Sequence, residues 1–153
     1  MVDFQYKDSY GVKDLEEIVR LLRAPGGCPW DAEQTHQSIR RNFLEEAYEA
    51  AEAIDREDPA LLKEELGDLL LHVVFHADIE RRAGNFTMDD VADGEVRKML
   101  FRHPHVFGDV VAGDANEVLD VWDQIKMAEK ESADAAADAP QGLLDGVPKS
   151  FPA

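Results

Sequence analysis

Hydrophobic residues recur along this chain at helical spacing. In residues 12–22, 35–54 and 60–82, apolar side chains return every three or four positions, which places them on one face of an α-helix. The same spacing predicts two further helices, over residues 87–102 and 115–131. The stretch 60–82 is the most apolar, so we expect its helix to be central. With no strand-like alternation, the pattern predicts an all-α bundle of about five helices whose central pair is antiparallel.

Prolines, glycines and capping residues mark where these helices begin and end. Asp58-Pro59 is typical of a cap followed by a first-turn proline, and Gly84 is expected to end the central helix. Thr87 is a suitable cap for the following helix. Residues 24–31, with two prolines and two glycines, and residues 103–109 are predicted to be loops.

The C-terminal part of the chain changes character after residue 131. Residues 132–140 are rich in alanine and aspartate and lack apolar periodicity, which predicts a flexible acidic linker. Residues 142–153 carry apolar side chains between prolines, as in a docking tail or a link to another domain. We therefore expect one helical domain over residues 1–131 and a flexible tail over residues 132–153.

Composition restricts the classes of partner. The 153 residues suffice for one domain, and the formal net charge of −17 leaves no basic surface for duplex nucleic acid. A small phosphorylated substrate that brings its own Mg²⁺ is still compatible with this charge. The single cysteine, Cys28, excludes an internal disulfide and favours a reducing compartment. Because no apolar run reaches the roughly 18 residues of a membrane span and no signal peptide is apparent, we expect a cytoplasmic protein without a membrane partner.

Two acidic pairs carry the strongest chemical signal. Glu46 and Glu49 lie three residues apart in one predicted helix, and Glu65 and Asp68 lie three apart in the next. Each pair shares a helix face, so antiparallel packing would bring four carboxylates together. Their repulsion would be relieved by a cation, and hard oxygen ligands favour Mg²⁺, Mn²⁺ or Ca²⁺. A solvated helix surface is the alternative, but the apolar neighbours of both pairs make unpaired charge costly there.

Gly67 lies between the members of the second pair. A glycine within a helix costs about 1 kcal/mol relative to alanine, which indicates that a neighbouring helix or a ligand comes close.

Other candidate sites are weaker. Asp68, His72 and His76 share a helix direction and could bind a transition metal, although packed polar histidines explain the pattern better. His103 and His105 in a proline-containing turn are a weak zinc pair, and Cys28 is a weak candidate for a catalytic thiol. The phosphate-binding loop, the dinucleotide fingerprint and the Glu-x-x-His arrangement of di-iron bundles are not found in the sequence.

Several motifs occur in an order that resembles a known family. They are Gly27-Cys28-Pro29-Trp30-Asp31, Gln34-Thr35, Leu44-Glu45-Glu46-Ala47-Tyr48-Glu49, Glu64-Glu65-Leu66-Gly67-Asp68-Leu69-Leu70, Arg102-His103-Pro104-His105-Val106-Phe107 and Trp122-Asp123-Gln124-Ile125-Lys126. Over roughly residues 12–131 the chain is similar to the MazG family of all-α nucleoside triphosphate pyrophosphohydrolases. Residues 143–148 resemble the link between two such domains, so the chain is similar to the N-terminal half of a two-domain protein.

The resemblance implies a dimerising helical enzyme that splits nucleoside triphosphates into monophosphate and pyrophosphate with Mg²⁺, for which Mn²⁺ can substitute. The family's metal ligands correspond to Glu46, Glu49, Glu65 and Asp68, and its water-activating glutamate to Glu45. The positions that hold the phosphates and the base correspond to Lys98, Arg102, Trp122 and Lys126. Trp30 and Asp31 are further candidates for substrate contacts.

Alternatives stay open at several levels. Trp122 suits base stacking or core packing equally well. The activity could be broad, or narrower, as in dUTP/dCTP or phosphoribosyl-ATP hydrolysis, or the domain could be a weakly active nucleotide-sensing and dimerisation module. We also expect a homodimer or a higher even oligomer, because one neighbouring helix cannot cover the apolar surface of residues 60–82.

Overall fold

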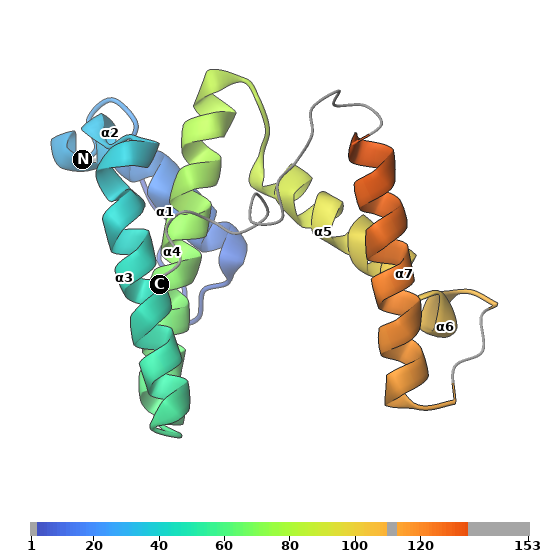
Figure 1. Ribbon diagram of the computed structural model, residues 1–153. Helices are drawn as coiled ribbons and strands as arrows, with labels where there is room; N and C mark the ends of the chain where they lie inside the picture. The colour runs from blue at the N-terminus through green and yellow to red at the C-terminus, as the bar shows by residue number, and fades with distance from the viewer. Residues whose placement is uncertain (1–2, 110–112, 135–153) are drawn as a thin grey trace. The chain divides into compact units, whose positions relative to one another are not determined.

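The computed structural model describes residues 3–109 and 113–134, and within these ranges it contains helices and no strand. The all-α prediction is therefore confirmed. The helices are α1 (Val12–Leu22), α2 (Pro29–Glu33), α3 (His36–Asp55), α4 (Pro59–Ala83), α5 (Met88–Arg102), α6 (Pro104–Phe107) and α7 (Ala115–Asp134), as labelled in Figure 1. Contacts between Cα atoms divide the chain into two compact units, Met1–Gly94 and Glu95–Ala153. None of the helices in the described ranges is long and apolar enough to cross a membrane.

The predicted helix ends are confirmed by their capping geometry. Asp58 Oδ1 accepts hydrogen bonds from the backbone N–H groups of Ala60 and Leu61 at 3.0 and 3.1 Å, and Pro59 follows in the first turn of α4. Gly84 ends α4 in the left-handed conformation, with φ of 80°. Thr87 and Asp90 cap α5 reciprocally, each side chain accepting from the other's backbone N–H. These boundaries follow from local chemistry alone.

Two predicted loops contain short helices, and one predicted boundary is too early. Pro29 opens α2 inside the expected loop 24–31, and Pro104 opens α6 inside the expected loop 103–109. A proline suits a first helical turn because its missing N–H is not needed there. Helix α7 continues to Asp134, so the first residues of the expected linker are helical. The rest of the expected linker and tail lies outside the described residues, and the domain boundary near residue 131 stays a prediction.

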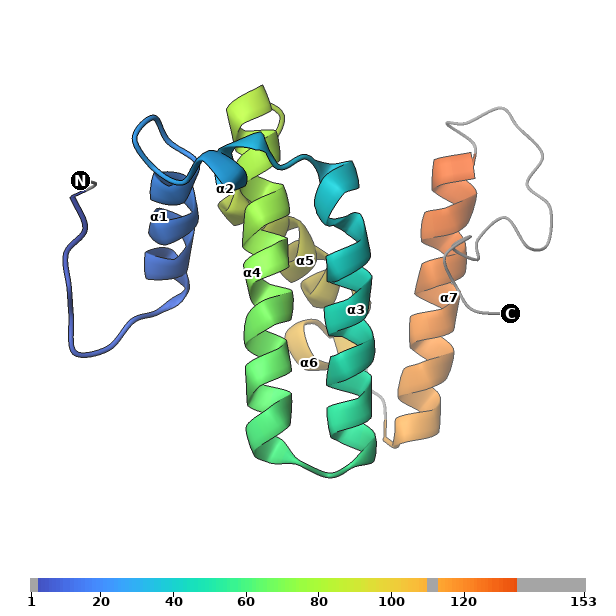
Figure 2. The same ribbon diagram turned by 90° about the vertical axis from the view of Figure 1, so that its left-hand side faces the viewer.

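The first unit is built around an antiparallel hairpin of α3 and α4. Figure 2 shows α4 between α3 on one side and α1 on the other, and α4 contacts both. Its core contains Val19, Ile39, Val74 and Phe75, with Leu15, Leu70, Leu71, Ile79 and Met88 packed against them. The expectation that the most apolar helix is central is thereby confirmed.

A buried ion network joins α1 to α4 at one end of the hairpin. Asp78 of α4 and Arg23, which follows α1, are 6% and 7% exposed, and Arg23 Nε donates to Asp78 Oδ2 at 3.0 Å. Arg81 donates to the other carboxylate oxygen at 2.7 Å and Arg82 to Oδ2 at 2.7 Å. Burial alone would raise the pKa of Asp78, but the hydrogen bonds and charges of the arginines hold it below its ordinary value. The sequence analysis did not anticipate this network.

Candidate metal centre

Three acidic side chains converge across the α3–α4 hairpin. Glu46, Glu49 and Glu65 each offer a carboxylate oxygen, and these three oxygens lie within 4.8 Å of one another. Glu46 and Glu49 are one turn apart on α3, and Glu65 faces them from α4. Glu65 is only 8% exposed, Glu46 is half-buried and Glu49 is exposed. The antiparallel hairpin therefore brings together three of the four carboxylates whose convergence the two acidic pairs predicted.

Burial and the repulsion of neighbouring carboxylates raise the pKa of two acids in this cluster. Burial raises the pKa of Glu46, and the neighbouring Asp68, Glu49 and Glu65 raise it further. Burial also raises the pKa of Glu65, reinforced by the charges of Glu49, Glu64 and Asp68. Both shifts mean that the protein disfavours full ionisation of the cluster. A bound cation would reverse that preference.

Asp68, the fourth predicted ligand, lies beside the cluster without belonging to the group of three. Its charge raises the pKa of both Glu46 and Glu65, so it is close to them. Its side chain is exposed. Three of the four predicted ligands are thus brought together, and ligation by Asp68 stays a prediction.

The donor set fits a hard divalent cation. Within the part of the chain that the structure describes, this group of carboxylates is the one set of three or more metal-binding side chains with converging ligand atoms. Oxygen-only ligands suit Mg²⁺ and Mn²⁺ and are unsuited to thiophilic metals. Glu46, Glu49 and Glu65 are the side chains that could hold such an ion in the described residues.

Glu45, the candidate general base, has a partner that the sequence analysis missed. Its half-exposed carboxylate accepts a hydrogen bond from Arg41 Nε at 2.8 Å, one turn earlier on α3. The i,i+4 spacing of opposite charges is the sequence signal that predicts such a pair. Glu45 lies outside the group of three converging carboxylates, which leaves it available for a different role from theirs.

Gly67 does not mark a close contact with another helix of the described chain. A Cβ atom built at this position would meet no atom of the described residues within 4 Å. The neighbouring-helix explanation is therefore wrong for this part of the chain. The other explanation, that a ligand comes close to Gly67, stays a prediction.

The histidines of the first unit are packed polar residues. His72 and His76 lie against the ring of Phe43, with ring centres 5.9 and 5.6 Å away. Nδ1 of His76 shares a hydrogen bond of 2.6 Å with Nδ1 of His36, whose Nε2 contacts Glu80 Oε1 at 2.6 Å. Burial lowers the pKa of both His72 and His76. These contacts agree with the favoured interpretation of packed polar residues, and His36 is an unanticipated partner.

The predicted phosphate- and base-binding residues lie in the second unit. Lys126 Nζ lies 4.2 Å from the ring centre of Trp122, and the Arg102 guanidinium lies 6.0 Å from it. Arg102 also donates to Glu129 Oε2 at 3.0 and 2.6 Å, while Lys98 forms an ion pair with Glu95. Trp122 is half-buried, and its Nε1 is buried without a hydrogen-bond partner in the described residues. Two cationic side chains thus lie near one aromatic ring, and the choice between stacking and packing for Trp122 stays open.

The other histidine pair forms no metal group in the described residues. His103 Nδ1 donates to the Met99 carbonyl at 2.6 Å, and its ring lies 5.9 Å from Trp122. His105 Nδ1 is buried, with no partner in the described residues.

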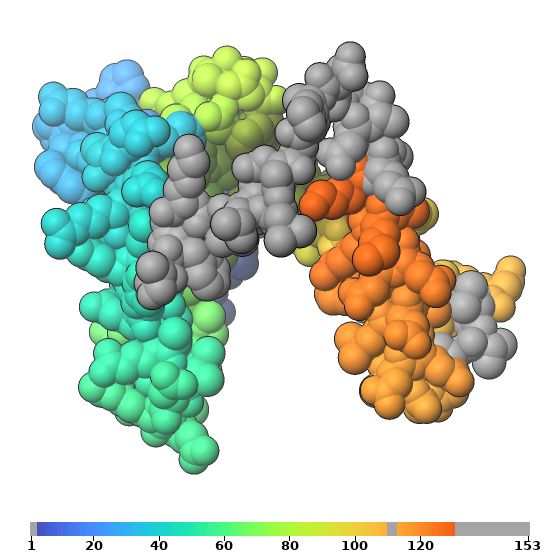
Figure 3. Space-filling model, viewed as in Figure 1, coloured from blue at the N-terminus to red at the C-terminus, as the bar shows by residue number. Residues whose placement is uncertain are grey.

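Trp30 and Asp31 belong to α2 in the first unit. The Trp30 side chain is 65% exposed, and Asp31 is half-buried. Cys28 at the start of α2 is a free, half-buried thiol. The side chains of α3, which follows α2, form much of the visible surface of the first unit in Figure 3.

Comparison with known proteins finds relatives that share most of this chain. Residues 34–107 match the model of the MazG nucleotide pyrophosphohydrolase domain. The nucleoside triphosphate pyrophosphohydrolase/pyrophosphatase MazG of Thermotoga maritima is 47% identical over 77% of this chain, and the nucleoside triphosphate pyrophosphohydrolase of Escherichia coli K12 is 45% identical over 91%. The uncharacterized protein YabN of Bacillus subtilis is 52% identical over 91%. A crystal structure of a MazG-related protein from Thermotoga maritima has a TM-score of 0.62 and 28% identity, covering 75% of this chain and 98% of that one.

The curated relatives are longer than the matching region. This chain spans 45% of the Thermotoga protein, 51% of the Escherichia coli protein and 27% of YabN. The match to the solved structure, in contrast, covers nearly the whole of that chain. The similarity therefore concerns one domain, and it includes both acidic pairs, which lie within residues 34–107.

Proposed function

The chain belongs to the MazG family, and on that premise we propose that it is a Mg²⁺-dependent nucleoside triphosphate pyrophosphohydrolase. The reaction converts a nucleoside or deoxynucleoside triphosphate and water into the monophosphate and pyrophosphate. The observation that carries the proposal is the convergence of Glu46, Glu49 and Glu65 across the hairpin, with raised pKa values for Glu46 and Glu65. Such a cluster is suited to a substrate that arrives with a divalent cation.

The residues divide into metal-binding and proton-transfer roles. Glu46, Glu49, Glu65 and Asp68 hold Mg²⁺, which when bound offsets the negative charge of the phosphates. Glu45 accepts a proton as water attacks phosphorus. The bond that breaks joins the attacked phosphorus to the oxygen between the α and β phosphorus atoms. The leaving group, pyrophosphate after attack at the α phosphorus or monophosphate after attack at the β phosphorus, departs with the electron pair. Attack at the α or the β phosphorus gives the same products.

Cationic and aromatic residues bind the rest of the nucleotide. Lys98 and Arg102 contact the phosphates and stabilise the charge that develops on them, while Trp122 and Lys126 hold the base. Trp30 and Asp31 on α2 contribute further contacts to the nucleotide. Stacking on an aromatic ring tolerates every base, which favours broad specificity and a cytoplasmic house-cleaning role that removes unwanted nucleotides.

We also propose that the hairpin dimerises. Tyr48, Ile54 and Leu66 of α3 and α4 are 53%, 61% and 52% exposed, which leaves apolar surface near the acidic cluster. The net charge of −17 opposes association, so salt should strengthen an apolar interface. Light scattering at micromolar concentration should give twice the 17.1 kDa chain mass or an even multiple. A monomer at moderate salt would contradict this proposal.

The function is tested by pyrophosphate release from all common NTPs and dNTPs, with Mg²⁺, with Mn²⁺ and with EDTA. We expect metal-dependent release of pyrophosphate and monophosphate from many of them. Activity confined to dUTP and dCTP would indicate a narrow enzyme, and nucleotide binding without turnover would indicate a sensing module. Hydrolysis in ¹⁸O-labelled water identifies the attacked phosphorus by the product that carries the label.

A further inference from the structure

We propose that Arg23 is a positioning residue that fixes helix α2 so that Trp30 is held ready for the nucleotide. The inference rests on the proposed function for the identity of the ligand. The side chain of Arg23 is buried, so Arg23 acts on nucleotide binding through the backbone of α2. The contacts that carry it all lie within the first unit.

Arg23 binds the end of α2 through two backbone carbonyl groups. Its Nη1 donates to the Asp31 carbonyl at 2.7 Å and to the Gln34 carbonyl at 3.3 Å. The last carbonyls of any helix lack partners within the helix. Helix α2 has only five residues, too few to be stable by its own hydrogen bonds. The Asp31 carbonyl receives only a long hydrogen bond of 3.4 Å from the Gln34 backbone N–H, so the shorter bond from Arg23 strengthens this end of α2.

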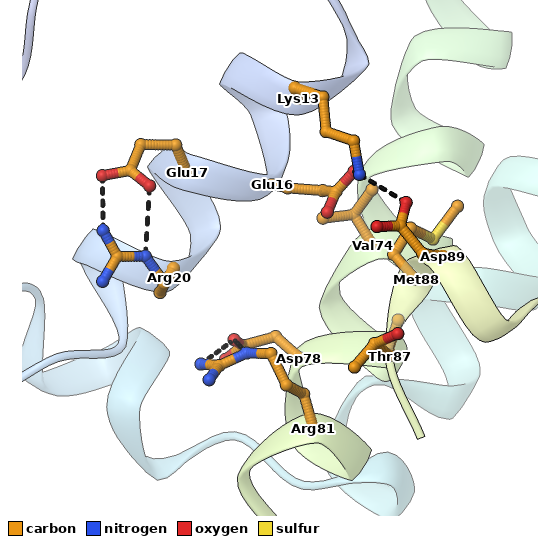
Figure 4. A pocket seen from close by; sticks show the side chains of 11 residues that line it. Lys13, Glu16, Glu17, Arg20, Val74, Asp78, Arg81, Thr87, Met88 and Asp89 are labelled. Carbon is orange, nitrogen blue, oxygen red and sulfur yellow. Dashed lines mark hydrogen bonds and ion pairs between the residues drawn. The ribbon is translucent and has the colours of Figure 1, made fainter.

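Arg23 is itself held in place. Its Nε is bound to Asp78, and its guanidinium lies 4.6 Å from the ring centre of Phe75 in the core. Asp78 is fixed in turn by Arg81 and Arg82, and Figure 4 shows Asp78 and Arg81 facing each other on α4. Arg23 therefore fixes the position of α2 relative to the central helix α4.

The segment that leads into α2 is tightly fitted as well. The Cys28 N–H donates to the Leu22 carbonyl at 2.7 Å, which ties the start of α2 to the end of α1. A Cβ at Gly27 would lie 2.3 Å from the Leu21 and Leu22 carbonyl oxygens, so only glycine fits this approach. Both ends of α2 are therefore anchored.

Trp30 is the large side chain that this anchored helix presents. It is 65% exposed, whereas its backbone carbonyl accepts a hydrogen bond of 2.8 Å from Gln34 Nε2. An exposed indole normally contributes little to folding, but on a fixed backbone it can stack on a base with little loss of conformational freedom. This combination of exposure and rigid mounting points to a binding role for α2.

The test compares Arg23→Gln with Arg81→Gln. Arg23 donates three hydrogen bonds, one to Asp78 and two to the backbone at the end of α2. Arg81 donates two, both to Asp78, so of these two arginines only Arg23 bonds to α2. We expect Arg23→Gln to raise KM for a nucleoside triphosphate about tenfold with kcat nearly unchanged, because a contact made equally in ground and transition states is weakened. Arg81→Gln should leave KM unchanged. Arg23→Lys, which keeps the charge opposite Asp78, replaces the glutamine variant if that variant does not fold.

Cys28 provides a readout that does not require turnover. It is the single cysteine of the chain and lies at the start of α2, so its rate of reaction with a bulky disulfide reagent reports the mobility of that segment. We expect labelling to be several-fold faster in Arg23→Gln than in Arg81→Gln at equal unfolded fraction, in line with local opening. In the unsubstituted protein, a nucleoside triphosphate with Ca²⁺ in place of Mg²⁺ should slow the labelling.

The outcomes separate this inference from the proposed function. Equal KM and equal labelling in the two variants would overturn it, because Arg23 would then be structural only. Failure of nucleotide to slow the labelling of Cys28 would overturn the role of α2 in binding. Protection of Cys28 without hydrolysis of any triphosphate would support the positioning role and contradict the enzymatic function.

Discussion

Helix α4 carries two buried acids that differ in how their charge is satisfied. Asp78 is 6% exposed and receives hydrogen bonds from three arginines, which hold its pKa below the ordinary value. Glu65 is 8% exposed and faces Glu46 and Glu49, and burial together with neighbouring negative charge raises its pKa. The same helix therefore holds one carboxylate that the protein satisfies and one whose ionisation it disfavours. A buried acid that the protein leaves in a repulsive environment is a good candidate for binding a cation from solution.

The different surroundings of Asp78 and Glu65 predict different roles, in stability for Asp78 and in function for Glu65. Removing one partner of a buried ion pair leaves an uncompensated charge and is strongly destabilising. Removing one member of a group of like charges relieves repulsion instead. The Asp78 network should therefore respond to mutation by unfolding, and the Glu65 cluster by losing activity.

The largest effect is expected from neutralising a ligand of the acidic cluster. Glu49→Gln and Asp68→Asn should each abolish Mg²⁺-dependent hydrolysis, because each removes a charged oxygen ligand. Both apo proteins should melt at the same temperature as the unsubstituted protein or higher. Pyrophosphate release and thermal unfolding check the two halves of this prediction. Full activity in either variant would remove that residue from the metal site.

A second large effect should separate Glu45 from the ligands beside it. Glu45→Gln should lower kcat by a factor on the order of 10² to 10⁴, as for loss of a general base, with Mg²⁺ affinity retained. Calorimetric titration with Mg²⁺ and steady-state kinetics measure the two quantities. Glu52→Gln, which breaks a comparable exposed pair between a glutamate of α3 and the C-cap residue Arg56, is the matched control and should be nearly silent. Loss of metal binding in Glu45→Gln would make Glu45 a ligand.

Neutralising the two buried acids of α4 should have different effects on the stability of the protein. Asp78→Asn should lower the free energy of unfolding by about 3 kcal/mol, because three arginines lose their shared anion. Glu65→Gln should leave stability unchanged or raise it in the absence of metal. Urea unfolding of both variants in EDTA at pH 7 gives the two values. Equal destabilisation would show that both acids are structural.

The effects of pH on the free energy of unfolding should be the smallest. They should have one sign for Asp78 and the opposite sign for Glu46 and Glu65. A carboxyl group with a lowered pKa in the folded protein stabilises it above the ordinary pKa, and this contribution of Asp78 is lost as the pH falls through the folded value. A carboxyl group with a raised pKa binds its proton more tightly in the folded protein, so Glu46 and Glu65 reduce stability as the pH rises past the ordinary value. The deficit of Asp78→Asn should therefore shrink in acid, whereas any gain of Glu65→Gln should appear only at higher pH.

The raised pKa values of Glu46 and Glu65 should also make metal binding depend on pH. Because Mg²⁺ favours the ionised cluster, its binding at mildly acidic pH should release protons from Glu46 and Glu65. Calorimetry in two buffers of different ionisation enthalpy measures that release. Glu65→Gln should reduce it, while Arg81→Gln, whose carboxylate partner is elsewhere on α4, should not.

Much of the fold and the acidic pairs could be predicted because they depend on local spacing. The periodicity of apolar residues located α1, α3, α4, α5 and α7, and caps such as Asp58 and Gly84 located their ends. The spacing of Glu46 and Glu49 places both on one helix face whatever the tertiary structure. The short helices α2 and α6 were missed because a single turn has no measurable period.

Local sequence patterns are enough to specify which segments are helical and which carboxylates share a face, because the hydrogen-bond geometry of a helix links residues only three or four positions apart. Helix packing is needed to bring Glu65 to Glu46 and Glu49, Arg23 to Asp78 55 positions away, and His36 to His76. Those partners depend on how the faces of different helices pack, which no local period specifies. The sequence thus contained both buried acids of α4. The packing of α4 between α1 and α3 added Arg23 to the local partners Arg81 and Arg82 of Asp78, and it brought carboxylate neighbours to Glu65.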